Sequence, residues 1–209
     1  SNNVRSDTIV HMLQYPQKPA VYTHMSKFMG FNDMPSGINV IVAIMSYTGY
    51  NQEDSIIFNQ ASIDKGLFRS ISFRTIMTQE RKKSTNNFEN ICVPGKDIQA
   101  KNYNYQKLDE NGIIRIGEVI ELNDIVIGKV LCSTQKNGKE VKTDCSVRVK
   151  KNETGIVDKI FINNTPNGYK MVKIKIRKQK IPEMGDKFAS REAQKGTVGI
   201  VLPAIDMPY

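Results

Sequence analysis

The chain carries an adjacent pair of carboxylates, Glu53 and Asp54, in a polar turn between two apolar segments. A carboxylate that leaves water is costly unless it is paired, hydrogen-bonded or bound to a cation. Mg²⁺ suits such a site, because it takes one or two carboxylates together with water and phosphate oxygens. Adjacent acids are also frequent in turns, where a carboxylate accepts backbone N–H groups. The residues alone leave a turn-capping role and a metal-binding role both open.

A second stretch carries three cations at a regular spacing, Lys187, Arg191 and Lys195. In a helix, residues at i, i+4 and i+8 share one face, and in a loop the same side chains can still converge. Fixed cations beside an acidic pair are what phosphoryl transfer on a nucleic acid requires. The alternative is a salt-bridged surface helix, in which Asp186 and Glu192 pair with these cations.

Hydrophobic patterns predict the elements that position these residues. The apolar run 40–45 predicts a buried strand before the acidic turn. Asn59 is a suitable helix N-cap and Gly66 a suitable helix stop, which predicts a short helix between them. Residues 67–77 alternate loosely and predict a strand, whereas the polar residues 78–90 predict a loop.

The middle of the chain predicts short strands joined by turns. Between residues 88 and 149, the Asn-Gly pairs at 111–112 and 137–138 are hairpin signals. Residues 155–162 and 169–177 predict two further strands. The expected fold class is mostly β with a few short helices, an α+β chain. The expected layout is one domain built from both ends of the chain, with a β-rich insertion of about a hundred residues between them.

The strand expected at 169–177 alternates between apolar and basic residues. Successive side chains of a strand point to opposite faces, so one face is apolar and the other positively charged. The apolar positions are Val172, Ile174 and Ile176, and the basic positions are Lys173, Lys175 and Arg177. A solvated strand face is the ordinary interpretation of such a row. A stripe that contacts nucleic-acid phosphates is its competitor.

Composition bounds the class of protein. The 209 residues include 30 basic and 21 acidic side chains, a net charge of +9 that favours an anionic partner such as nucleic acid. No apolar run is long enough for a membrane span, and none resembles a signal-peptide core. The cysteines are isolated and histidines are scarce, so we expect no zinc site and a reducing, intracellular compartment. These residues are Cys92, Cys132, Cys145, His11 and His24.

Six segments, in order and spacing, resemble the second-largest subunit of multisubunit DNA-directed RNA polymerase. They cover both ends of the chain, and they are closer to the eukaryotic, archaeal and large-DNA-virus type than to the bacterial β subunit. The segments are 15–19 (YPQKP), 47–55 (YTGYNQEDS), 59–69 (NQASIDKGLFR), 180–191 (KIPEMGDKFASR), 194–199 (QKGTVG) and 206–209 (DMPY).

The resemblance implies a fold, a domain division and partners. Residues 1–69 and 181–209 correspond to the hybrid-binding region, which in this family contains a discontinuous double-psi β-barrel. Residues 70–180 correspond to the inserted β-rich wall, or flap, domain. The implied partners are the largest polymerase subunit, other polymerase subunits, template DNA, the RNA–DNA hybrid and nucleoside triphosphates, in the nucleus, the cytoplasm or a virion.

The resemblance also assigns roles to the chemical residues. Glu53 and Asp54 match an acidic pair near the second, nucleotide-borne Mg²⁺, with Glu53 acting through water. This metal is shared with the largest subunit. Lys187 and Lys195 match two lysines at the RNA 3′ end and the incoming nucleotide. Together they imply a part in nucleotidyl transfer to RNA.

Two further residues and one departure belong to the same motif. Arg191 matches a neighbouring basic residue, and Gln194 precedes the second lysine; both are expected to bind nucleic acid or nucleotide. The family usually has His-Gly between the arginine and Gln-Lys-Gly, whereas this chain has Glu192 and Ala193. The departure removes a glycine and places an acid among the cations. The two lysines keep their spacing.

Two other classes of function compete with a polymerase subunit. A stand-alone β-rich nucleic-acid-binding module without catalysis fits the composition and the basic strand equally well. A small metal-dependent nuclease would use Glu53 and Asp54, but it lacks the further carboxylates or histidines that a self-sufficient two-metal site needs. The largest subunit's aspartate-rich Mg²⁺ loop, Asn-Ala-Asp-Phe-Asp-Gly-Asp, does not occur in the sequence. We therefore expect the chain alone to be inactive.

Overall fold

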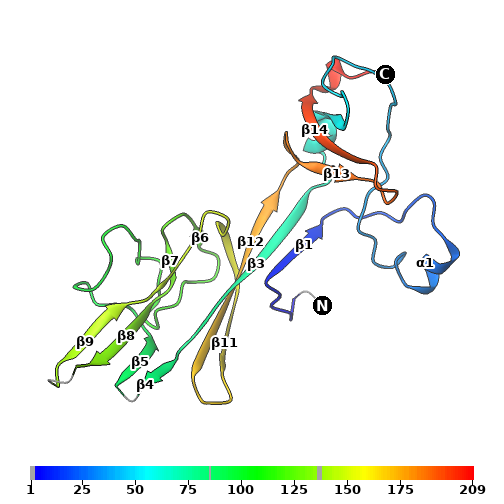
Figure 1. Ribbon diagram of the computed structural model, residues 1–209. Helices are drawn as coiled ribbons and strands as arrows, with labels where there is room; N and C mark the ends of the chain where they lie inside the picture. Colours follow the sequence, from blue (N-terminus) through cyan, green and yellow to red (C-terminus); the bar gives the residue numbers. More distant parts are fainter. Residues whose placement is uncertain (1–2, 85, 136–137) are drawn as a thin grey trace. The chain divides into compact units, whose positions relative to one another are not determined.

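The structure, a computed structural model, describes residues 3–84, 86–135 and 138–209. The described residues form fourteen β-strands and two short α-helices (Figure 1). The chain is therefore mostly β with a minor helical part, which confirms the fold class expected from the sequence. The strands are arranged in four sheets, and the double-psi β-barrel implied by the resemblance stays a prediction.

The chain forms two compact units, and each combines segments that are distant in sequence. Unit 1 comprises Ser1–Val10 and Ser72–Lys178, and unit 2 comprises His11–Ile71 and Gln179–Tyr209. The internal boundaries lie two residues from the domain boundaries expected after residues 69 and 180. The first ten residues belong to the same unit as the insertion.

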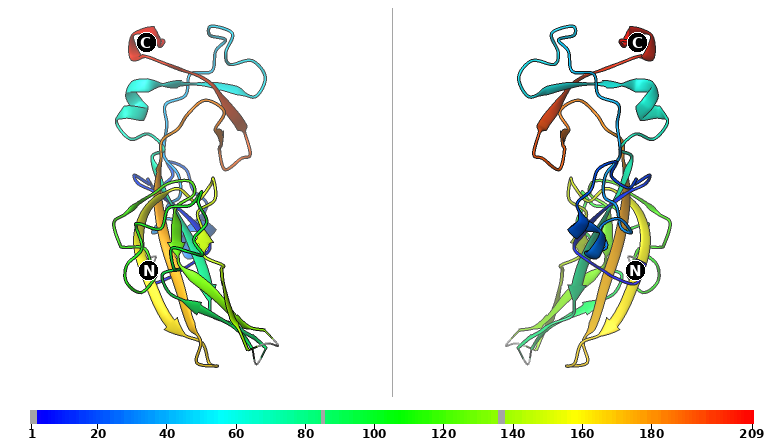
Figure 2. Two further views of the ribbon diagram at one scale, coloured as in Figure 1. Left: turned by 90° about the vertical axis from the view of Figure 1, so that its left-hand side faces the viewer. Right: turned by 90° about the vertical axis from the view of Figure 1, so that its right-hand side faces the viewer.

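The largest sheet has five strands in the order β1-β3-β12-β11-β6. Its centre is an antiparallel hairpin of β11 and β12, which lie side by side in both views of Figure 2. The apolar face expected on β12 is confirmed, because Val172, Ile174 and Ile176 are all buried in the core. The strand bounds are β1 Ile9–Leu13, β3 Ser70–Gln79, β6 Val119–Ile120, β11 Gly155–Asn164 and β12 Lys170–Lys180.

Unit 1 contains two further sheets, a four-stranded sheet in the order β4-β5-β8-β9 and a β10-β7 pair. The loop predicted for residues 78–90 is wrong, because β4 and β5 form a polar hairpin there. The predicted hairpin of β8 and β9 is confirmed, although Asn137 of its turn lies outside the described residues. The bounds are β4 Lys82–Ser84, β5 Asn87–Ile91, β7 Ile125–Ile127, β8 Lys129–Thr134, β9 Glu140–Asp144 and β10 Val147–Arg148.

The core of unit 1 is a cluster of β-branched side chains from all three of its sheets and the turns between them. Isoleucine and valine fit a pleated, two-sided core because their branched side chains pack well on strands. The cluster comprises Ile76, Ile91, Ile113, Ile114, Ile120, Val126, Ile127, Val149, Val157, Val172, Ile174 and Ile176.

Unit 2 is built around a three-stranded sheet in the order β13-β14-β2, in which β2 and β14 are parallel. The helix predicted after Asn59 is confirmed: the Asn59 side chain accepts a hydrogen bond from the backbone N–H of Ala61 at 3.0 Å. Gly66, at φ +104°, follows the helix end. The bounds are α1 His24–Phe28, β2 Ser55–Asn59, α2 Gln60–Asp64, β13 Lys187–Ala189, β14 Lys195–Leu202 and the 3₁₀ helix η1 Ala204–Asp206.

Three phenylalanines form an aromatic cluster in unit 2. The ring centroids of Phe58 and Phe68 both lie within 5 Å of the Phe188 centroid, at 4.9 and 4.8 Å. Phe58 belongs to β2 and Phe188 to β13, so the cluster joins two strands of the sheet that carries the chemical residues.

The buried strand predicted for residues 40–45 is wrong in this structure. The described run has no assigned strand, and Ile41 and Ile44 are fully exposed. The apolar pattern predicts burial, but within the described residues the side chains of Ile41, Val42 and Ile44 stay exposed.

Candidate functional site

The acidic pair lies in an exposed turn immediately before β2. Both Glu53 and Asp54 are exposed, and the turn is closed by a 3.0 Å hydrogen bond from the Ser55 N–H to the Gln52 carbonyl. Glu53 has φ +53°, a left-handed conformation that costs a non-glycine residue about 1–2 kcal/mol. Within the described residues, neither carboxylate has a hydrogen-bond or ion-pair partner. In this structure the carboxylates therefore do not cap the turn.

Asn51 and Gly199 hold the acidic turn in place, and neither role was predicted from the sequence. The Asn51 side chain donates to the Met45 carbonyl at 2.6 Å and accepts from the Tyr47 N–H at 3.2 Å. A Cβ at Gly199 would lie 2.3 Å from the Tyr50 carbonyl oxygen, so only glycine lets β14 approach the turn this closely. Two sequence signals could have indicated these roles: Asn51 is an asparagine in a turn, and Gly199 is a glycine inside a strand pattern.

The two lysines lie on one hairpin, formed by β13 and β14. The strands pair antiparallel, with Lys187 opposite Thr197 and Ala189 opposite Lys195. Alternate residues of paired strands share a face, so Lys187 and Lys195 project from the same face of the hairpin. Both lysines are exposed, and neither has an ion-pair partner in the described part of the chain. The helical alternative for this stretch is wrong.

Backbone pairing joins the acidic turn to this hairpin. The Thr197 N–H donates to the Asp54 carbonyl at 2.7 Å, and Thr197 stands opposite Ser55 in the parallel pair of β14 and β2. A Cβ at Gly196 would lie 2.9 Å from the Ile56 side chain and 3.3 Å from the Asp54 carbonyl oxygen. The strand that begins with the second lysine therefore starts beside the acidic pair. The structure brings the carboxylates and the lysines to one end of one sheet.

The turn between β13 and β14 carries the remaining predicted residues. The Arg191 guanidinium donates to the Val21 carbonyl at 2.5 Å, and Gln194 is exposed. Hydrogen bonds from its own backbone N–H and from Ser190 lower the pKa of Glu192. Ala193 has φ +62°. The second of the two residues that depart from the expected motif therefore has a left-handed backbone conformation.

The basic row on β12 is not the exposed stripe that the sequence predicted. Lys175 is only 2% exposed, and its ammonium lies 4.5 Å from the centroid of the Phe73 ring. A cation over an aromatic face is stabilised by the ring quadrupole, which helps a lysine to be buried. Lys173 is half-buried and donates to the Ser6 hydroxyl at 3.4 Å. Arg177 is exposed and lies 3.7 Å from Asp158. Of the three cations, only Arg177 is exposed, and it lies beside a carboxylate.

The acidic pair fits a shared Mg²⁺ but does not form a complete site. Mg²⁺ requires about six oxygen ligands in near-octahedral geometry, and proteins supply one or two carboxylates. Glu53 and Asp54 offer unpaired, exposed oxygens of that kind. Among the described residues, no group of three or more His, Cys, Asp or Glu side chains could hold a metal ion. The remaining ligands would have to come from water, phosphate or another chain.

Two further sequence expectations concern cysteines and membranes. All three cysteines are free and half-buried, and burial raises the pKa of the Cys92 and Cys145 thiols. No helix in the described ranges is long and apolar enough to cross a membrane. The reducing compartment stays a prediction.

Comparisons with known proteins identify the family. The family model described as "RNA polymerase Rpb2, domain 6" matches residues 1–209. The chain belongs to this family of second-largest RNA polymerase subunits. It is 46% identical to DNA-directed RNA polymerase II subunit RPB2 of Encephalitozoon cuniculi over 99% of the chain and 19% of that protein.

Relatives of the Rpb2 family come from the three groups that the motifs indicated. A probable RPB2 homolog of Invertebrate iridescent virus 6 is 43% identical over 100% of the chain and 18% of that protein. DNA-directed RNA polymerase subunit Rpo2 of Sulfolobus acidocaldarius is 43% identical over 99% of the chain and 19% of that protein. The resemblance stated from the sequence is thereby confirmed. The chain spans about a fifth of the length of these curated relatives.

Proposed function

We propose that this chain forms one wall of the catalytic centre of a DNA-directed RNA polymerase. In that role it holds the RNA–DNA hybrid and the phosphates of the incoming nucleotide within an intracellular multisubunit enzyme. The observation that carries the proposal is the gathering of unpaired carboxylates and unpaired lysines at one end of the β13-β14-β2 sheet. Family membership supports it, because the relatives are polymerase subunits by name.

The residues of this chain would act by positioning charge. Lys187 and Lys195 bear fixed cations on one face of a hairpin, where they would neutralise phosphate oxygens of RNA and nucleotide. Asp54, with Glu53 through water, would orient a Mg²⁺ carried by the triphosphate and shared with the largest subunit. When bound, such an ion neutralises charge on the oxygens of the transferring phosphoryl group. Arg191 and Gln194 would line the same end of the sheet.

The incomplete ligand set of the acidic pair predicts that catalysis depends on a partner subunit. Two carboxylates supply fewer ligands than Mg²⁺ requires, and no further cluster of metal-type side chains occurs in the described ranges. The chain alone should therefore add no nucleotides and hydrolyse no nucleic acid. A chain that cleaves nucleic acid with Mg²⁺ on its own would support the nuclease alternative instead.

Replacing Asp54 tests the proposal in the assembled polymerase. We expect Asp54→Ala to slow nucleotide addition by about 30- to 1,000-fold, the range for loss of one preorganised electrostatic contact worth roughly 2–4 kcal/mol. The Mg²⁺ concentration that gives half-maximal rate should rise. The measurement is single-nucleotide addition on a preformed RNA–DNA scaffold across a Mg²⁺ titration.

Asp33→Ala is the matched control, because Asp33 is an exposed aspartate of the same unit outside the sheet end. It should leave both the rate and the Mg²⁺ dependence unchanged. Wild-type rates for Asp54→Ala at limiting Mg²⁺ would count against the proposed role. They would favour a nucleic-acid-binding part without a role in chemistry.

A further inference from the structure

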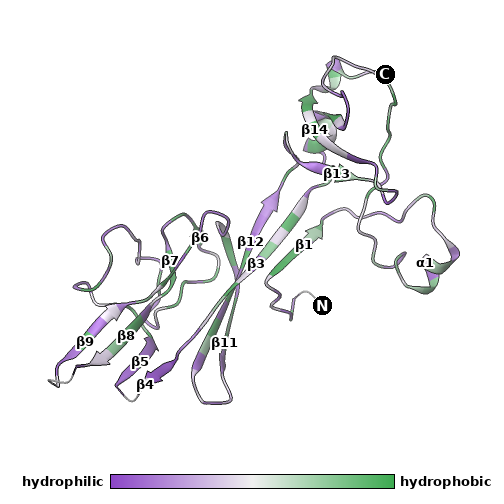
Figure 3. Cartoon of the chain, viewed as in Figure 1, coloured by the Kyte–Doolittle hydropathy of each residue, from purple (hydrophilic) through white to green (hydrophobic). Residues whose placement is uncertain are grey.

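The β4–β5 hairpin of unit 1 carries three consecutive cations immediately before a serine. The four residues are Arg81, Lys82, Lys83 and Ser84. No other serine or threonine among the 209 residues has basic side chains at all three preceding positions. All four residues are exposed, and Figure 3 colours β4 as hydrophilic. The segment therefore contributes charge and a hydroxyl group to the surface, and it adds no packing to the core.

β4 is the outermost strand of its sheet. The sheet order is β4-β5-β8-β9, and in the described part of the chain β4 pairs only with β5. An edge strand presents main-chain N–H and C=O groups along its outer side. Proteins that recognise extended peptides bind them through such groups. Residues 82–84 are therefore already in the conformation that a peptide-binding groove accepts.

Ser84 lies at the end of the hairpin where the pairing is irregular. Lys82 stands opposite Phe88 and Ser84 opposite Asn87, so the register shifts between the two β4 residues. Such a bulge disrupts the ladder of hydrogen bonds locally. Within the described ranges, the Ser84 hydroxyl has no hydrogen-bond partner. The end of the hairpin should therefore open at low cost in free energy and present this hydroxyl.

The cations before Ser84 are available to a partner. Among the described residues, Arg81 and Lys82 have no ion-pair partner. Lys83 lies 3.3 Å from the Glu89 carboxylate, but its side chain is still 57% exposed. Complementary charge guides association, and charge patterns beside the acceptor select the substrates of protein kinases. The segment suits an enzyme whose peptide groove is acidic.

We propose that Ser84 is the phosphate acceptor of a serine/threonine protein kinase that recognises basic residues before its target. The Ser84 Oγ forms a bond to the γ-phosphorus of ATP, and the bond from that phosphorus to the β–γ bridging oxygen breaks. ADP leaves, and the hydroxyl proton passes to the kinase's catalytic carboxylate. Phosphoserine carries a charge of about −1.5 to −2 at pH 7, so it offsets at least half of the charge of the three cations. The inference does not depend on the proposed catalytic role.

Mass spectrometry of the full-length subunit tests whether the site is used. The polymerase is purified from its natural source in the presence of phosphatase inhibitors, and the phosphorylated peptides are sequenced. We expect a peptide with phosphate on Ser84, and phosphatase treatment should remove it. A subunit without phosphate at Ser84 overturns the proposal, and so does phosphate that is found only on Thr85.

A kinase assay on the assembled polymerase tests whether the cations are recognised. The probe is the catalytic subunit of cAMP-dependent protein kinase, which prefers basic residues two and three positions before a serine, with radiolabelled ATP. We expect label at Ser84, and Ser84→Ala should remove it. Arg81→Ala should lower kcat/KM for this labelling by about tenfold or more, the effect of losing one hydrogen bond to a charged group.

Ser36→Ala and Arg115→Ala are the matched controls. Ser36 is an exposed serine with no basic residue at the three preceding positions, and Arg115 is an exposed arginine of unit 1 outside the hairpin. Neither substitution should change the labelling of Ser84. Equal losses in Arg81→Ala and Arg115→Ala overturn the proposal. An assembled polymerase that takes up no label at Ser84 also overturns it, and would indicate that nucleic acid or another subunit covers the hairpin.

Discussion

At the scale of single residues, Ala193 shows how the chain tolerates its departure from the family motif. Its φ of +62° lies in the left-handed region, which costs an alanine about 1 kcal/mol relative to glycine. The N–H of Ala193 bonds to the Ser190 carbonyl at 3.2 Å, so the turn keeps its shape and bears the strain. This strained turn joins the two strands that carry Lys187 and Lys195.

We predict that Ala193→Gly stabilises the β13–β14 hairpin. The expected gain is about 0.5–1 kcal/mol, because glycine relieves the left-handed strain but loses more entropy on folding. The measurement is the exchange rate of the Lys195 amide, which bonds within this turn to the Ala193 carbonyl at 3.0 Å.

Ala189→Gly is the matched control, since Ala189 lies in β13 on the same hairpin and is not among the positive-φ residues. Glycine there should destabilise the hairpin by about 0.5–1 kcal/mol. If both substitutions shift the exchange rate of the Lys195 amide in the same direction, strain at Ala193 does not determine the stability of this hairpin.

Residue-level chemistry was only partly readable from the sequence. Asn59 was recognised as a helix cap because its side chain acts on a neighbour two residues away. The roles of Asn51 and Gly199 depend on which backbone lies opposite them, which spacing along the chain does not reveal. Lys175 was expected on a charged face, but its burial against Phe73 is set by packing of a different strand.

At the scale of elements, an ion pair joins strands β5 and β8 in unit 1. The Lys129 ammonium lies 2.5 Å from the Glu89 carboxylate, and both side chains are nearly buried. Lys83 approaches the same carboxylate at 3.3 Å. Burial acts to raise the pKa of Glu89, but the nearby ammonium groups of Lys129 and Lys83 outweigh it and lower the pKa below its ordinary value.

We predict that this pair makes unit 1 sensitive to acid. A carboxyl whose pKa is lower in the folded state stabilises that state above its unfolded pKa, here 4.5, and the contribution is lost as pH falls through the folded value. Asp124, held by Lys107, acts in the same direction. The protection factors of the amides in β5 and β8 of the intact subunit, each measured against the intrinsic exchange rate at the same pH, should therefore fall below about pH 4.5.

Glu89→Gln sharpens this test. It removes the titrating group and leaves the Lys129 charge buried, so we expect about 3 kcal/mol less protection at pH 7 and a weaker dependence on pH below 4.5. Glu110→Gln, at an exposed position, is the control and should change neither quantity. If Glu89→Gln keeps the wild-type pH profile, the Glu89–Lys129 pair does not cause the acid sensitivity of unit 1.

Elements were predicted best where one local pattern decides them. The strands at 155–162 and 169–177 were predicted from their own residues, without knowledge of the rest of the chain. The spacing of Lys187, Arg191 and Lys195 fits a helix face, yet pairing with β2 makes the segment a hairpin. The apolar run 40–45 predicts a buried strand, whereas the described residues leave the run without strand pairing and largely exposed.

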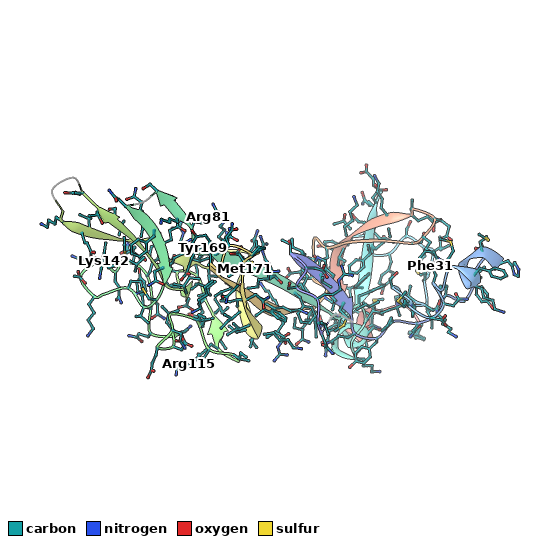
Figure 4. All side chains as sticks on the ribbon, turned by 90° about the horizontal axis from the view of Figure 1, so that it is seen from below. Phe31, Arg81, Arg115, Lys142, Tyr169 and Met171 are labelled. Carbon is teal, nitrogen blue, oxygen red and sulfur yellow. The ribbon has the colours of Figure 1, made fainter. Side chains whose placement is uncertain are left out.

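At the scale of the whole molecule, the net charge divides unequally between the units. Unit 1 carries 22 basic and 13 acidic residues, whereas unit 2 carries 8 of each. The entire charge of +9 therefore belongs to unit 1, and the unit that carries the acidic pair and the lysines is neutral. Figure 4 labels three exposed cations of unit 1, Arg81, Arg115 and Lys142.

This division predicts different consequences for charge changes in the two units. Binding to a polyanion through phosphate contacts depends on salt, since each contact releases counterions. In unit 1, charge reversal of a cation that contacts a phosphate should therefore change the salt dependence of nucleic-acid binding. Unit 2 has no net charge, so we expect a charge change at the acidic pair to alter the rate of nucleotide addition, as argued for Asp54.

Arg177 and Arg115 allow the whole-molecule prediction to be tested with two variants that change the net charge by the same amount. Both are exposed arginines of unit 1, and each lies near a carboxylate, at 3.7 Å from Asp158 and 3.6 Å from Glu118. If Arg177 on β12 contacts a phosphate, Arg177→Glu should weaken binding of an RNA–DNA scaffold by the full polymerase. The slope of log affinity against log salt should become shallower by about 0.9. Arg115→Glu changes the net charge equally and should leave that slope unchanged. If both variants change the salt slope equally, unit 1 acts through its total charge. If both variants keep the wild-type salt slope, the exposed end of β12 is a solvated face.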